Sequence, residues 1–270
     1  MPAINLTRLK NQSDLLVDLF DQPDAFLHKL EEILEYYTNY TLRASQVIQK
    51  SNLATYNTPR PVLLQIENAI EKLADQKPHA AVNLIDALWK ASFYETRLLS
   101  AFLLGTIPPA LAMSLLTRLP ERLYETQDQG IKNALLTSAF ARLRRENPHI
   151  LMMMISEWLN APGPKTQSWG LHALIPLIQQ LGYDDLPKIF KILRPAIETV
   201  STSTEMDIQV CINALYLISP IETIHYLNEI LQETKNPQVV RIFIRYMRGF
   251  PPEKQKELGI TIKNKTSSIS

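Results

Sequence analysis

The chain has 270 residues, which is enough for one or two domains with a continuous hydrophobic core. Apolar residues make up 46% and charged residues 20%, so the composition is that of a globular protein and excludes a disordered chain. The 28 lysines and arginines nearly balance the 27 aspartates and glutamates, so net charge gives no global reason to bind nucleic acid.

The sequence contains no run of eighteen apolar residues, so we expect no transmembrane helix and no membrane contact. The first residues lack an apolar signal region, so we do not expect secretion. Cys211 is the only cysteine and cannot form an intramolecular disulfide, which fits a reducing compartment. We therefore expect a cytoplasmic protein.

The first 52 residues are predicted to form capping helices. A short helix is expected over 14–20 and a long one over 23–50, with Pro23 in its first turn. A connector follows, because Asn57-Thr58-Pro59 is typical of a turn. Only seven glycines are present, and no alternating strand pattern appears, so the fold class is predicted to be all-α.

Helical pairs are predicted from residue 59 to residue 250. Prolines at the starts of many second helices support these pairs, because an N–H in the first turn of a helix has no intrahelical hydrogen bond that proline could remove. We expect proline only at helix starts and in the connections between helices. The expected helices are 59–74 with 78–89, 93–104 with 108–119, 127–145 with 148–159, 167–181 with 184–199, 204–218 with 221–233, and 236–248 at the start of a last pair.

The stretch 86–105 contains the first example of a pattern that recurs along the chain. Leu98, Ala101, Phe102 and Gly105 fall on one helix face, and Ala101 and Gly105 are small enough for another helix to approach closely. A small residue followed by an apolar one recurs at spacings of 38, 34 and 41 residues, at 101–102, 139–140, 173–174 and 214–215. Such spacings predict a right-handed α-solenoid of about six helical pairs with a concave face. We expect a single domain over 1–260 and a flexible tail over 261–270.

Several segments resemble known helical repeats. They are Ala87-Leu88-Trp89, the run 94–99, the run Ser168-Trp169-Gly170-Leu171-His172-Ala173-Leu174, and Pro59-Arg60-Pro61-Val62. Together they resemble the HEAT-like (armadillo-type) repeat superfamily and, more narrowly, the DNA alkylation repair family of HEAT-like glycosylases.

The resemblance implies a catalytic pattern. Such glycosylases use an aspartate that stabilises the positive charge on the departing alkylated base, a tryptophan shortly before it, and an arginine on a later helix. Asp128 would be that aspartate, with Tyr124 as its nearest aromatic residue, and Trp169 and His172 lie where the arginine is expected. The structural alternative for Asp128 is a favourable interaction with a helix dipole.

The remaining candidates each have a structural and a functional interpretation. Trp169 and His172 are possible ligand contacts, whereas Trp89 and Trp158 are predicted to lie in the core. Glu95 is expected to complement a helix dipole, and Arg97 to pair with an acid on the preceding helix such as Asp86. The five histidines show no metal-ligand spacing, so no metal site and no cofactor are expected.

Arg241, Arg245 and Arg248 stand at i, i+4 and i+7 on the last long helix. This stripe would bind phosphates, or it would be the charged outer face of a terminal repeat. The opposite, buried face is predicted to consist of Val240, Phe243, Ile244 and Met247. The sequence therefore predicts an interaction module that binds a protein or a nucleic-acid backbone on its concave face. The alternative is a DNA glycosylase that removes alkylated purines.

Overall fold

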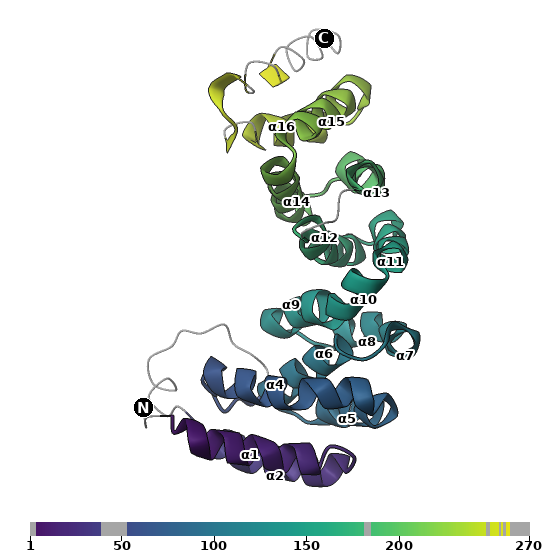
Figure 1. The fold of residues 1–270 in the computed structure, drawn as a ribbon. Helices are drawn as coiled ribbons and strands as arrows, with labels where there is room; N and C mark the ends of the chain where they lie inside the picture. The colour runs from purple at the N-terminus through teal and green to yellow at the C-terminus, as the bar shows by residue number, and fades with distance from the viewer. Residues whose placement is uncertain are drawn as a thin grey trace. The chain divides into compact units, whose positions relative to one another are not determined.

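The computed structural model describes residues 4–38, 53–180, 185–246, 249–253, 255 and 258–259. Helices make up all of its regular elements, so the all-α prediction is confirmed for this part of the chain (Figure 1). The pairing of Ala54 with Phe93 is an isolated β-bridge outside any strand. Contacts between Cα atoms divide the chain into two compact units, residues 1–147 and 148–270.

The first unit is built from helices that pack in two overlapping rows. One row runs from α1 to α4, then to α6 and to α9, while α2 packs against α5. Consecutive helices α4, α5 and α6 also pack against each other. The helices are α1 (Leu6–Asp18), α2 (Pro23–Tyr36), α4 (Arg60–Gln76), α5 (Pro78–Lys90), α6 (Tyr94–Leu104), α7 (Pro109–Leu116), α8 (Leu119–Glu125), α9 (Gln129–Thr137), the 3-10 turn η1 (Ser138–Phe140) and α10 (Ala141–Glu146).

The end of α6 is a point of close approach, as the small residues there predict. A Cβ on Gly105 would lie 1.9 Å from the carbonyl oxygen of Ser138, so η1 can cross at this point only because Gly105 has no side chain. Ala101, one turn earlier, is fully buried. The carbonyl of Gly105 also accepts a hydrogen bond from the Arg142 N–H at 3.0 Å, which fixes the start of α10.

The second unit is also built from helices that pack against one another. Helix α11 packs against α12 and α13, α12 against α14, and α14 against α15. Gly170 allows α12 to touch α11, since a Cβ there would lie 2.9 Å from the side chain of Leu159. The helices are α11 (Pro148–Asn160), α12 (Pro164–Ile178), α13 (Leu186–Glu198), α14 (Glu205–Ile218), α15 (Pro220–Glu233) and α16 (Pro237–Tyr246).

Several predicted helix boundaries were wrong. The first helix begins at Leu6 because the Asn5 side chain accepts the N–H of Arg8 and caps it. The helix predicted over 108–119 ends at Leu116, and α8 starts anew with a proline in its first turn. The helix predicted over 127–145 is interrupted by η1, where the backbone crosses Gly105.

Proline is not confined to helix starts and connections, although the sequence pattern predicted that it would be. Pro176 lies inside α12 and Pro195 inside α13. Each stands within the last four residues of its helix, so little of the helix continues beyond the hydrogen bond that the proline removes. The predicted helix over 23–50 ends at Tyr36, and its part from 39 onward lies outside the described residues, as does the predicted tail over 261–270.

Candidate functional site

Asp128 is the N-cap of α9. Its Oδ1 accepts the backbone N–H of Ile131 at 3.0 Å, and the residue is 9% exposed. The aromatic residue beside it is Tyr94: a Cβ on Gly130 would lie 2.4 Å from the Tyr94 hydroxyl and 3.2 Å from Asp128 Oδ1. Burial raises the pKa of Tyr94, and the nearby Asp128 carboxylate raises it further. This geometry favours the structural interpretation of Asp128, because the carboxylate completes the first turn of a helix.

Trp169 is 7% exposed and meets Trp158 edge to face, with ring centroids 6.3 Å apart. Trp158 and Trp89 are also buried, as predicted. The place of Trp169 between α11 and α12 is that of an aromatic core residue, and its role as a ligand contact stays a prediction.

His172 has an acidic partner that sequence reasoning missed. Its Nε2 lies 3.0 Å from Oδ1 of Asp207, and the Ser168 hydroxyl donates to Oδ2 of the same carboxylate at 2.5 Å. Burial alone would raise the pKa of Asp207, but the bonds from His172 and Ser168 outweigh it and the pKa is lowered. The carboxylate lies between hydroxyl and imidazole, so the serine proton is directed to Asp207 and not to a histidine base. The cluster joins α12 to α14.

The arginine stripe lies on an exposed face of α16. Arg245 is 66% exposed and forms an ion pair with Glu205 on α14, while Arg241 is exposed. The prediction of the opposite face was right for Val240 and Phe243, which are buried. It was wrong for Ile244, which is 41% exposed because it lies beside Arg241 around the helix, on the exposed side. The remaining predicted members, Met247 and Arg248, lie outside the described residues.

The predicted pairing of Arg97 with Asp86 was wrong. The Asp86 carboxylate instead binds Arg122 at 2.6 Å and Arg118 at 3.6 Å. Arg97 lies over the ring of Trp89, 4.7 Å from its centroid, and Arg122 lies 5.0 Å from the same ring. These cation–π contacts stabilise the packing around α5 and α6.

Glu95 does more than complement a helix dipole. It is 2% exposed, and its carboxylate accepts hydrogen bonds from the Thr55 hydroxyl and from the backbone N–H groups of Tyr56 and Thr58. A single carboxylate thus anchors the connector before α4 to the first turn of α6.

An exposed apolar face runs along α14. Met206, Val210 and Leu217 are 67%, 41% and 81% exposed, and their spacing of four and seven residues places them in one line along the helix. Asn213 completes this line, and Ile221 follows at the start of α15 with 75% exposure. We call Met206, Val210, Asn213 and Leu217 the α14 stripe.

The other side of α14 is apolar as well. Ile208, Cys211, Ile212 and Leu215 are buried against the rest of the second unit. Apolar helix faces are normally buried, and only one of the two apolar faces of α14 is covered within the described residues. The sequence signal was present, since two apolar lines of helical period overlap in 205–218, but the sequence analysis did not single it out.

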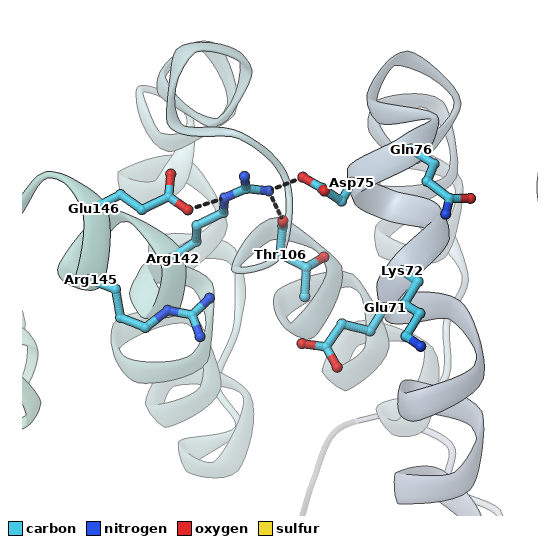
Figure 2. Close-up of a pocket in the computed structure, with 8 residues that line it drawn as sticks. All are labelled: Glu71, Lys72, Asp75, Gln76, Thr106, Arg142, Arg145 and Glu146. Atoms are coloured by element: carbon cyan, nitrogen blue, oxygen red, sulfur yellow. Dashed lines mark hydrogen bonds and ion pairs between the residues drawn. The ribbon is translucent and has the colours of Figure 1, made fainter.

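A charged cleft of about 470 Å³ lies in the first unit, between α4 and α10 (Figure 2). Arg142 closes one end: its Nη1 contacts Asp75 at 2.6 Å and the carbonyl of Thr106 at 2.8 Å, and its Nε contacts Glu146 at 2.7 Å. The cleft was not predicted from the sequence. Its charged lining residues are Glu71, Lys72, Asp75, Arg142, Arg145 and Glu146.

Across the described residues, no group of three or more His, Cys, Asp or Glu side chains is arranged to hold a metal ion. None of the described helices is both long and apolar enough to span a bilayer. No protein-family model, curated protein or solved structure matches this chain.

Proposed function

We propose that this chain is a helical-repeat module of the α-solenoid type that binds a protein partner through the α14 stripe. The repeat architecture is supported by the spacing of the side-chain hydrogen bonds between helices. Within each unit, many of these hydrogen bonds join positions 35 to 41 residues apart, close to the period of the small–apolar pairs in the sequence. Examples are Trp89 with Glu125, Arg142 with Thr106, His172 with Asp207, Tyr226 with Phe190, and Tyr246 with Glu205.

That spacing has a simple physical cause in stacked helical pairs. Each residue meets the equivalent position of the next pair, because the pairs pack in the same register and none can bury its apolar face alone. The right-handed stack of about six pairs, including its relation to HEAT-like repeats, is part of this proposal.

The exposed α14 stripe is the observation that carries the binding function. Three large apolar side chains stand in water along one helix, and burying apolar surface stabilises a complex by about 25 cal/mol per Å². Contiguous exposed apolar surface of this kind marks interaction sites in soluble proteins.

The stripe also indicates the form of the partner. The four stripe positions, three of them apolar, are separated by four, three and four residues, which matches the seam between two packed helices, so the partner is an amphipathic helix with the same spacing. The stripe itself contains no charged residue, and Asn213 near its middle favours a partner position that can accept or donate a hydrogen bond.

A protein partner fits the charges better than a nucleic-acid backbone does. Phosphate binding requires cations that are free to contact phosphates, whereas several arginines of this chain are bound to its own carboxylates. Arg194 contacts Glu198, Glu229 and Glu233, Arg122 contacts Asp86, and Arg245 contacts Glu205.

The test compares capture of proteins by the purified chain and by charged variants of the stripe. Val210→Glu and Leu217→Glu place a carboxylate in the proposed interface and are expected to abolish capture of the partner. Leu6→Glu is the matched control, since Leu6 is 74% exposed on α1. A partner retained by both stripe variants, or lost equally with the control, contradicts the proposal.

The glycosylase function implied by the family resemblance is less well supported. The Asp128 carboxylate is engaged by the Ile131 N–H, and the first aromatic beside it is Tyr94 instead of a tryptophan. Incubation with duplex DNA carrying N-methylated purines tests this alternative. We expect no release of free base, and release that is lost in Asp128→Asn would support the enzyme.

A further inference from the structure

Charged side chains of α4 and α10 face each other at two levels of the cleft in the first unit, which we call the first and second positions. At the first, Arg142 is held by Asp75, Glu146 and the carbonyl of Thr106, with contacts of 2.6 to 2.8 Å. This position is closed: every contact is made within the chain, and it fixes α10 against α4 and the end of α6.

The second position lies one helical turn away and is open. Arg145 follows Arg142 by three residues and Glu71 precedes Asp75 by four, so each pair shares one face of its helix. Figure 2 shows the guanidinium of Arg145 and the carboxylate of Glu71 reaching into the cleft from opposite walls. Both residues are exposed, and among the described ion pairs none joins them or engages the neighbouring Lys72.

We propose that this open position binds a ligand that carries both a carboxylate and an ammonium group. The guanidinium of Arg145 receives the carboxylate with two parallel hydrogen bonds, and the carboxylate of Glu71 accepts from the ammonium. The ligand thereby completes across the cleft the contact that Arg142 and Asp75 make directly one turn away.

Charge and size agree with this ligand class. The free groups are two cations, Arg145 and Lys72, and one anion, Glu71, so an isolated cation is disfavoured and the ligand needs an anionic group, which a carboxylate supplies. A volume of about 470 Å³ lies within the usual range for small-molecule sites. Two sources share this chemistry: a small zwitterion, and a peptide segment with neighbouring basic and acidic side chains. The inference is independent of the α14 stripe, which belongs to the other unit.

The proposal is tested by titrating small probe molecules into the full chain and measuring their binding by calorimetry and by changes in NMR chemical shift. The probes are ε-aminocaproate for the small zwitterion, the dipeptide N-acetyl-Lys-Glu-amide for the peptide segment, and acetate and methylammonium as single-charge references. We expect at least one of the first two to bind, and both references to bind about tenfold more weakly than it does. The tighter of the two zwitterionic probes identifies the source.

Variants separate the proposed contact from a general charge effect. Arg145→Gln and Glu71→Gln are each expected to weaken the binding of the tighter probe about tenfold. Lys165→Gln and Glu157→Gln remove the same charges from exposed positions of the second unit and are expected to leave binding unchanged. The double exchange Arg145→Glu with Glu71→Arg reverses the polarity and is expected to restore binding, because a small zwitterion can turn around.

Three results would overturn the proposal. Acetate binding as tightly as the zwitterionic probes would make the cleft a simple anion site, and tighter binding by Glu71→Gln would lead to the same conclusion. Absence of binding by all four probes would mean that Arg145 and Glu71 have only a structural or solvating role.

Discussion

Replacing Gly105 by alanine has two effects of opposite sign on the free energy of unfolding. The backbone at Gly105 has φ −78° and ψ −3°, a conformation that alanine adopts without strain. At a helix end this substitution would ordinarily stabilise by up to about 1 kcal/mol, because alanine restricts the unfolded chain. The packing term opposes it: the new Cβ would lie 1.9 Å from the oxygen and 2.9 Å from the carbon of the Ser138 carbonyl.

The packing term is the larger one. Ser138 meets the new Cβ with backbone atoms, which cannot rotate away as a side chain does, so the whole of η1 must move. Overpacking of this kind costs about 1–3 kcal/mol. Movement of η1 would also strain the hydrogen bond from the Arg142 N–H to the Gly105 carbonyl. We therefore expect Gly105→Ala to destabilise the protein by about 2 kcal/mol.

Urea unfolding, followed by circular dichroism, measures this cost. Gly249→Ala is the matched control, because a Cβ at Gly249 would meet nothing within 4 Å, and its unfolding midpoint is expected to stay the same or rise slightly. A Gly105→Ala variant at least as stable as the parent chain would refute the close approach of η1 to α6.

Three further variants or reactions test other contacts. Glu95→Gln replaces a buried carboxylate oxygen that accepts hydrogen bonds with an amide that cannot accept them, and should cost about 2 kcal/mol and make 54–58 sensitive to proteolysis. Because the folded-state pKa of Asp207 is lowered from 3.8, its stabilisation is complete above about pH 4 and is lost as the pH falls further. Urea midpoints of Asp207→Asn should therefore lie below those of the parent chain at neutral pH and converge with them in acid; a constant difference would mean that the ionised carboxylate is not what stabilises the cluster. Burial raises the pKa of the Cys211 thiol, so a thiol reagent should label it only on unfolding, and rapid labelling of the native chain would show that α14 is not packed as described.

The helices were predictable because their signals are local. Proline marks the first turns of α5, α11 and α15, where its missing N–H costs no hydrogen bond, and these starts agree with those predicted from the sequence. The break between α7 and α8 was missed because the apolar period continues across it, although Pro120 gives a local reason for it.

The contacts between helices were not predictable from the sequence. The partner of His172 was not predicted because Asp207 stands 35 residues away, and only the register of α12 against α14 brings the two together. Arg97 was assigned to Asp86 for want of the same information, whereas Arg122 takes that carboxylate from 36 residues away. The cleft depends likewise on residues of α4 and α10 that are 67 positions apart.

Crosslinking from the α14 stripe in living cells is the most direct test of the central claim. A photoreactive residue is placed at Leu217 in one variant, at Met206 in a second, and at the exposed Leu6 of the other unit as control. We predict that Leu217 and Met206 crosslink to the same partner protein, that Leu6 does not, and that Val210→Glu removes both crosslinks. If the two stripe positions crosslink to nothing, or only to the proteins that Leu6 also reaches, the α14 stripe is not a binding surface.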